Sequence, residues 1–248
     1  MYFRQYVAVL RVLLAADRDQ VPMLLLNGLA LPATLAYFLA RLANSGQVPA
    51  ALYAKTFTLC LSAPMIQLGY AWLQDRTRKN RELLQTVQPG PWIYTAARMT
   101  TAVLGAVLLY ACLLILGRAT LFSFSLPTSL GVLLIVAFAA LPLCALAALI
   151  AESLPTASKS TTLVIWTSLA LVGMSPVLWQ APASLAWVNA FQESVPHGVL
   201  LNALRALVNP GTRSLGALAM PAALLLASGL LLCAWIVHKC GPRQSHRS

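Results

Sequence analysis

The stretch PTSLGVLLIVAFAALPLCALAALI, residues 127–150, decides the fold because its 24 consecutive residues carry no charge. A helix of this length is about 36 Å long, more than the ~30 Å hydrocarbon core of a bilayer. Strands of a membrane barrel would alternate apolar and polar residues, and neither this stretch nor the rest of the chain does so. The stretch therefore predicts a membrane-spanning helix.

Five further stretches have the same character: residues 23–40, 51–73, 99–117, 160–179 and 215–237. Only one charged residue falls within the six, Lys55, whose long side chain can reach the interface. Pro64 and Pro142 lie inside two of the stretches and are expected to kink them. The sequence thus predicts an all-α membrane protein, with residues 1–248 forming a single transmembrane domain of six transmembrane helices.

Composition supports this class. Of the 248 residues 59 % are hydrophobic and 9 % are charged, whereas a soluble domain carries roughly a quarter charged residues. Such a chain is too apolar for a soluble fold or for intrinsic disorder. The five cysteines are odd in number, and four of them lie in apolar runs, which predicts small buried side chains rather than a disulfide framework.

The basic residues predict the orientation. The net charge is +11, and with six spans 12 of the 17 basic residues fall on one side and 5 on the other. Positive charge concentrates in cytoplasmic loops, so we expect both termini in the cytoplasm and no role for nucleic acid. The first apolar run starts late and is long enough to anchor, so no cleavable signal peptide is expected. The expected location is the plasma membrane, the inner or cell membrane of a bacterium.

The first 20 residues form an amphipathic pattern. Arg4, Arg11 and Arg18 recur every seven residues, opposite a strip of apolar side chains at helical spacing. This pattern predicts an interfacial helix over residues 1–20 whose arginines contact anionic lipid headgroups. The alternative is a helix that extends the first span into water.

A loop on the cytoplasmic side, residues 76–90, is predicted to contain a short helix parallel to the membrane. Leu83, Leu84 and Val87 form one apolar stripe, Pro89-Gly90 ends the helix, and Pro91 suits the first turn of the next one. So small an apolar face needs the bilayer surface or a groove on a partner.

The run from Arg81-Glu82-Leu83-Leu84 to Pro89, followed by Trp92-Ile93-Tyr94, resembles the coupling-helix segment of ABC-2 type transporter permeases. The later succession of Pro182, Trp187, Val195-Pro196 and Leu204-Arg205-Ala206-Leu207 is similar to the segment before the last span of that family. The six spans and the long last outer loop extend the resemblance over nearly the whole chain. The sequence departs from the family at Lys79-Asn80-Arg81, where a glycine-rich lead-in is common.

This resemblance implies the membrane subunit of an ABC exporter, which pairs with a second permease copy or a homologous permease and with two copies of an ABC ATPase subunit. None of the 13 glycines precedes a lysine, so the chain has no P-loop, and ATP and Mg would bind to the partner ATPase. No cofactor or metal is expected in this chain. By resemblance, the ATPase would be contacted by Arg78, Arg81, Glu82, Leu83, Leu84 and Val87. The alternative is a solvated basic loop that only fixes topology.

The outer segment, residues 182–209, is apolar but too short in each half to span a membrane, so it predicts two re-entrant or interfacial helices. Val199, Leu200, Ala203, Leu204 and Leu207 share one face of the second helix. By resemblance these helices dip into the outer leaflet near the exit, and four residues are assigned to this outer gate: Trp187, Phe191, Glu193 and Arg205. Glu193 and Arg205 are also expected to pair with each other.

Two other functions find less support in the sequence. A membrane-embedded enzyme needs clustered polar chemistry at membrane depth, and an ion-coupled carrier needs an acidic residue within a span. The spans contain no carboxylate and no histidine. Glu152 is expected to make a helix-end or loop contact, and His197 to lie at the interface. The uncharged spans favour a lipophilic or amphipathic substrate, such as a drug, an antimicrobial peptide or a lipid-linked molecule.

Overall fold

The computed structural model describes residues 2–18, 50–77, 91–120, 126–154, 156–182, 184–208 and 215–240, with the single positions 22 and 34. Every element in these ranges is a helix, which confirms the all-α class there. The elements are α1 (Tyr2–Asp17), α3 (Ala50–Leu59), α4 (Ser62–Thr77), α6 (Pro91–Thr120), α7 (Leu126–Ser153), α8 (Ala157–Gly173), α9 (Ala186–Ser194), α10 (Pro196–Val208), the 3-10 helix η2 (Leu215–Leu218) and α11 (Ala219–Cys240). The predicted span 23–40 lies outside the described residues.

Three helices of the described ranges are long and apolar enough to cross a membrane: Trp92–Ile115, Leu126–Ser153 and Gly216–His238. They correspond to the predicted spans 99–117, 127–150 and 215–237. The first is longer than expected because α6 begins at Pro91, whose fixed φ suits the first helical turn. The length and composition of these helices indicate a membrane protein.

The predicted span 51–73 is two helices, α3 and α4, separated by a turn at Cys60 and Leu61. Pro64 has no N–H to donate to the Cys60 carbonyl, and its ring crowds that oxygen. Tighter bonds form around the break: Cys60 N–H donates to Phe57 O and Ala63 N–H to Cys60 O, both at 3.1 Å. The expected effect of Pro64 is confirmed, whereas α7 continues without a break through Pro142.

The predicted span 160–179 ends early, because α8 stops at Gly173. Ser175 Oγ donates to Val172 O at 2.7 Å, and Trp179 Nε1 donates to Gly173 O at 2.9 Å. These bonds satisfy carbonyls at the helix end, and Pro176 cannot continue the helix. Residues 174–178 therefore form turns and bends instead of a last helical turn.

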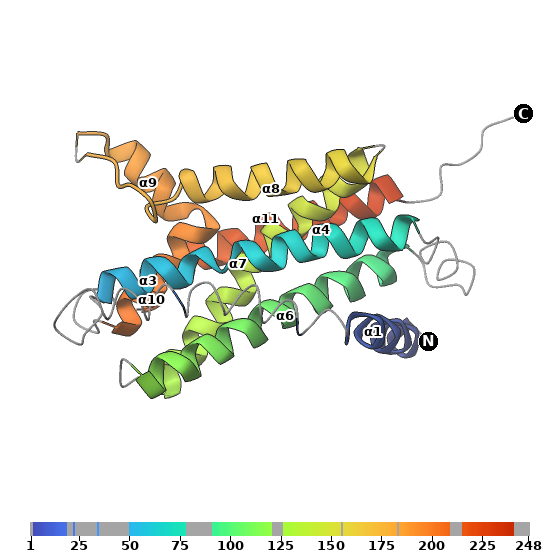
Figure 1. The fold of residues 1–248 in the computed structure, drawn as a ribbon, viewed down its shortest axis with the longest axis horizontal. Coiled ribbons are helices and arrows are strands. Elements are labelled where there is room, and N and C mark those ends of the chain that lie inside the picture. The colour runs from blue at the N-terminus through green and yellow to red at the C-terminus, as the bar shows by residue number, and fades with distance from the viewer. Residues whose placement is uncertain are drawn as a thin grey trace, which may run out of the picture.

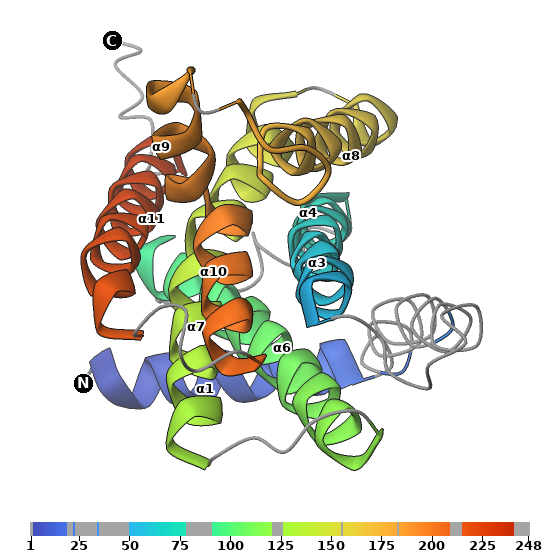
Figure 2. The same ribbon diagram turned by 90° about the vertical axis from the view of Figure 1, so that its left-hand side faces the viewer.

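The helix α7 lies in the middle of the bundle and contacts α4, α6, α8, α10 and α11 (Figures 1 and 2). Small side chains, alanines above all, make up much of its buried surface, so its neighbours approach closely. At Gly229 of α11 an added Cβ would lie 2.7 Å from Leu141 Cγ and 3.0 Å from Pro142 N. Glycine is required there by close packing of two helices.

The two ends of the bundle differ. At one end α1 runs crosswise to the long helices and packs on α6, burying Val9 and Leu13 (Figures 1 and 2). At the other end α10 packs on α3 and α7, with α9 beyond it. The C-terminal ends of α4 and α7 and the N-terminal end of α6 lie at the end of the bundle where α1 packs (Figure 1).

Candidate functional site

Four polar side chains meet at the α1 end of the bundle, the buried Asp75, Tyr94 and Arg98 and the half-buried Asp17, called here the Arg98 cluster. Asp17 is the last residue of α1, Asp75 lies in the last turn of α4, and Tyr94 and Arg98 lie in the first turns of α6. Tyr94 and Arg98 are four residues apart, so they share one face of α6 and both reach Asp75. The cluster joins three helices at one point.

The cluster neutralises the positive charge of Arg98, which would otherwise be costly to bury. The Arg98 side chain is 2 % exposed, and its Nε donates to Asp75 Oδ2 at 2.8 Å while Nη2 lies 2.6 Å from the same oxygen. The Tyr94 hydroxyl donates to that oxygen at 2.8 Å, and Arg98 Nη1 pairs with Asp17. A guanidinium is stable at such depth because carboxylates neutralise it and accept its hydrogen bonds.

Further bonds tie the end of α4 to the end of α7. Arg76 Nη1 donates to Ala151 O at 3.0 Å and to Leu154 O at 2.8 Å, where a cation is favourable because the last carbonyls of a helix lack partners. Trp72 Nε1 donates to Glu152 Oε2 at 3.2 Å, which confirms the helix-end contact expected of Glu152. The Trp72 ring also meets Tyr94 edge to face, with centroids 5.4 Å apart.

These contacts fix both stems of the loop between α4 and α6. The preceding stem, at the end of α4, is held through Asp75 and Arg76; the following stem, at the start of α6, is held through Tyr94 and Arg98. Any displacement of the loop must therefore act on α1 and α7 as well as on α4 and α6.

The loop residues themselves lie outside the described residues: Arg78, Arg81, Glu82, Leu83, Leu84 and Val87. The segment predicted as a coupling helix, 76–90, is described only at Arg76 and Thr77, which form the end of α4. The role predicted for the six side chains stays a prediction.

The three arginines assigned to lipid headgroups, Arg4, Arg11 and Arg18, are all exposed on or beside α1. The opposite side of α1 packs on α6, where the Tyr6 hydroxyl and Thr100 Oγ1 are 2.8 Å apart. Tyr2 and Phe3 are 65 % and 78 % exposed. A helix that exposes both basic and large apolar side chains fits the headgroup region of a bilayer.

At the other end, the predicted apolar face of residues 199–207 lies on α10 and is buried where α10 packs against α3 and α7. Trp187 and Phe191 share the exposed side of α9, at 74 % and 50 % exposed, while Glu193 and Arg205 are half-buried. Gly198 allows α10 to follow α9 directly, since an added Cβ would lie 1.9 Å from Gln192 O. The pairing expected between Glu193 and Arg205 stays a prediction.

His197 lies in a different environment from the one that the sequence predicts. It was expected at the interface, but it is fully buried at the start of α10, and its Nε2 lies 3.2 Å from Ser62 Oγ. Its Nδ1 is buried with no hydrogen-bond partner in the described part of the chain. Val195-Pro196 places the first turn of α10 inside the bundle, against the break between α3 and α4, so the ring is covered.

The Arg98 cluster is not among the sites that the sequence predicts. Arg98 was expected only as one more basic residue of the cytoplasmic side, and the predicted spans contain no carboxylate. A signal was present: Asp75 follows one predicted span by two residues, and Arg98 precedes the next by one. Opposite charges at equal depth on consecutive antiparallel helices are placed to pair.

In the described ranges, no three His, Cys, Asp or Glu side chains come together in a way that would hold a metal ion. The Arg98 cluster positions helices, because all its described bonds join one helix to another. Neither a scan of protein-family models nor a search of curated proteins finds a match to this chain.

Proposed function

We propose that this chain is the membrane-spanning permease subunit of an ATP-driven exporter of the ABC-2 type. The observation that carries the proposal is the anchoring of the loop between α4 and α6: Asp75, Arg76, Tyr94 and Arg98 tie both stems to the rest of the bundle. A loop that receives force from a partner needs such stems, whereas a loop that only fixes topology does not.

The proposed topology has six transmembrane helices. The described helices α6, α7 and α11 are three of them; α3 with α4 forms one broken span, α8 is a short one, and residues 23–40 supply the sixth. The crosswise position of α1 at the bundle end supports an interfacial helix there (Figure 2). The short helices α9 and α10 supply the re-entrant pair at the opposite, outer end.

The proposed assembly contains two permeases and two ATPase subunits in the plasma membrane, with both termini cytoplasmic. ATP and Mg bind to the ATPases, since this chain carries no P-loop. Leu83, Leu84 and Val87 dock into a groove on the ATPase, and Arg78, Arg81 and Glu82 orient the contact. The cargo is lipophilic or amphipathic, in keeping with spans almost free of charge.

The decisive experiment replaces Glu82 by Lys in the assembled complex and measures substrate-stimulated ATP hydrolysis and transport. Reversal of this charge beside Arg78 and Arg81 creates like-charge repulsion on the loop, so we expect both activities to be lost while membrane insertion is retained. The companion variant Leu84→Asp places a charge in the apolar stripe, where burial without a partner costs more than one leucine contributes.

A loop that only fixes topology predicts the opposite result, because an added lysine agrees with the positive-inside bias. Normal transport by Glu82→Lys would therefore overturn the coupling role. A chain without its native cysteines and with Gln85→Cys checks the orientation independently. The new cysteine should react with a thiol label only from the cytoplasmic side.

An ion-coupled carrier remains the second candidate, because the structure buries a carboxylate, Asp75, at the end of a helix. A carrier site must release and rebind its ion, yet Asp75 Oδ2 is held by Arg98 and Tyr94. Transport by proteoliposomes that contain this chain and no ATPase, driven by a proton gradient alone, would favour the carrier and refute the exporter.

A further inference from the structure

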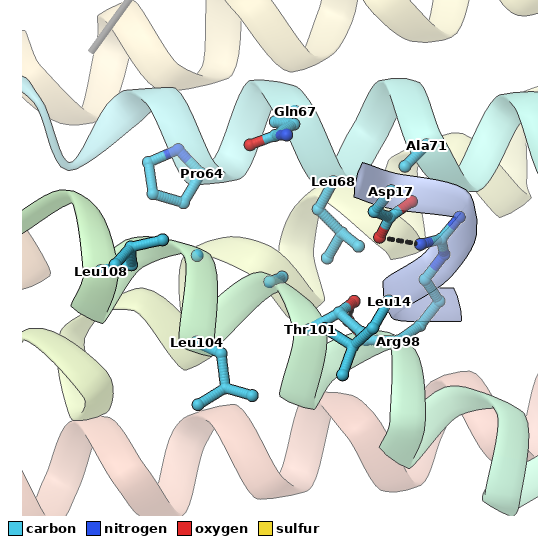
Figure 3. Close-up of a pocket in the computed structure, with 12 residues that line it drawn as sticks. Leu14, Asp17, Pro64, Gln67, Leu68, Ala71, Arg98, Thr101, Leu104 and Leu108 are labelled. Carbon is cyan, nitrogen blue, oxygen red and sulfur yellow. Dashed lines mark hydrogen bonds and ion pairs between the residues drawn. The ribbon is translucent and has the colours of Figure 1, made fainter. Parts of the chain in front are cut away.

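We propose that the cavity between α1, α4 and α6 binds the head of an amphiphile that carries a protonated amine. The cavity has a volume of about 140 Å³. Figure 3 shows its two characters: Asp17 and Arg98 lie paired at one end, and Pro64, Leu68, Leu104 and Leu108 line the rest. The site is independent of the transport proposal, since it rests on these side chains alone.

The polar end of the cavity lacks one hydrogen-bond donor. Asp17 Oδ2 pairs with Arg98, but Asp17 Oδ1 is buried and has no hydrogen-bond partner among the described residues. A buried carboxylate oxygen without a donor is costly, so a ligand that donates there is favoured. The Arg98 cluster contains two carboxylates and one guanidinium, so its net charge is −1. A donor with a positive charge therefore fits better than a neutral or anionic one.

A primary ammonium meets both requirements because it carries three N–H donors and one positive charge. Each nitrogen of the Arg98 guanidinium already pairs with a carboxylate, so an anionic head would meet two carboxylates and a cation whose charge they already neutralise. The hydroxyl of Thr101, which also lines the cavity, donates to Arg98 O at 2.8 Å and can still accept from the ligand. These groups define a small polar recess rather than a wide channel.

The apolar part of the cavity limits the size of the ligand and the path of its alkyl chain. A cavity of about 150 Å³ holds a molecule of the size of benzene, so this one has room for the head and a few carbons. The remaining chain must leave between the helices, and Leu104 and Leu108 are 49 % and 45 % exposed on the side of α6 that borders the cavity. An alkyl chain would continue along them into the hydrocarbon of the bilayer.

The test uses the full-length chain in phosphatidylcholine nanodiscs and an octylammonium probe with a diazirine in its alkyl chain. After photolysis, labelled peptides are identified by mass spectrometry. We expect labelling at residues 64–71 of α4 and 101–108 of α6. Asp17→Asn should reduce it at least tenfold, and Ala102→Leu should do the same by filling the cavity. Glu193→Gln, which removes a carboxylate at the other end of the bundle, should leave labelling unchanged.

Two further probes separate charge from apolar affinity. An octanol probe that carries the same diazirine should label these peptides weakly, and Asp17→Asn should not change that labelling. Its labelling of the lipid-facing helix surfaces reports that the variant is folded. Equal labelling of wild type and Asp17→Asn by octylammonium, or equal labelling by octylammonium and octyl sulfate, would overturn the proposal. Absence of labelling at 64–71 and 101–108 would also overturn it, and would leave water as the partner of Asp17.

The same chemistry has two sources, a lipid headgroup and a soluble cationic amphiphile. Phosphatidylethanolamine carries a primary ammonium, whereas the quaternary ammonium of phosphatidylcholine has no N–H to donate. Suppressed labelling in phosphatidylethanolamine nanodiscs would identify the lipid as the occupant. Unchanged labelling there would identify a cationic amphiphile from solution.

Discussion

Replacement of Arg98 by Met should destabilise the chain by about 3–5 kcal/mol, the usual cost of breaking a buried ion pair from one side. Methionine keeps much of the length and apolar contact of the arginine stem. What it removes are the bonds from Nε and Nη2 to Asp75 and from Nη1 to Asp17. The Asp75 side chain, 7 % exposed, would then keep the bond from the Tyr94 hydroxyl but lose its cationic partner.

The measurement is reversible unfolding of the purified chain in mixed detergent micelles with increasing sodium dodecyl sulfate. A loss of 3–5 kcal/mol lowers the folding equilibrium constant by a factor of roughly 150–4,000. The double variant Asp75→Asn/Arg98→Met removes the stranded charge, so it should recover at least half of the loss. Arg76→Met is the matched control: this arginine lies at the same bundle end but is exposed, and its loss should cost about 1 kcal/mol.

The reasoning depends on the pair being shielded from water. If Arg98→Met and Arg76→Met lose equal stability, or if the double variant is no more stable than Arg98→Met, the Arg98 cluster is solvated and its buried-charge argument is wrong. The stems of the loop between α4 and α6 would then be held by apolar packing, as at Trp72 and Ile93, and by the bonds of Arg76 to the end of α7.

Two further predictions concern the opposite end. Gly198→Ala should cost about 1–3 kcal/mol or more of the free energy of unfolding, because the added carbon overlaps the Gln192 carbonyl. Gly173→Ala, whose added Cβ would have no atom within 4 Å, should be neutral. The unfolding midpoints of the two variants give the comparison, and equal midpoints would contradict the close approach of α9 and α10 at Gly198. Ser62→Ala should cost about 1–3 kcal/mol, since it removes the described hydrogen-bond partner of the fully buried His197 imidazole. Ser62→Thr keeps the hydroxyl and should retain more of the stability. Equal losses in the two variants would show that the 3.2 Å contact between Ser62 and His197 contributes nothing.

Apolar run length and helix-ending residues explain what the sequence predicted well. The uncharged run at 127–150 became α7 almost residue for residue, and Pro91 began α6 as expected. Pro64 broke a helix while Pro142 did not, although both lie in apolar runs. The difference is position: Pro64 stands in the first turn of α4, where a missing N–H is tolerated, so the break falls naturally before it. Pro142 lies in mid-helix and is enclosed by α11 through Gly229.

The parts that could not be predicted depend on pairings between distant helices. Asp17, Asp75 and Arg98 are separated by tens of residues, and one sequence does not show that α1 turns across the bundle so that its last residue reaches α6. His197 was misplaced for the same reason, since its burial depends on how α10 meets α3. Residue type fixed the cost of burying these groups, but only the arrangement of helices supplied their partners.

The early end of α8 has a consequence for the surrounding lipid. Its 17 residues are about 25 Å long, several ångströms less than an ordinary hydrocarbon core, whereas the 30 residues of α6 are about 45 Å long. If α8 crosses the membrane as proposed, the bilayer must thin locally along it, and the exposed Trp179 and Trp187 just beyond it would mark a lowered outer surface. Lipids with short acyl chains would then gather along this side of the protein, which makes membrane thickness itself a variable that acts on the α8–α9 corner.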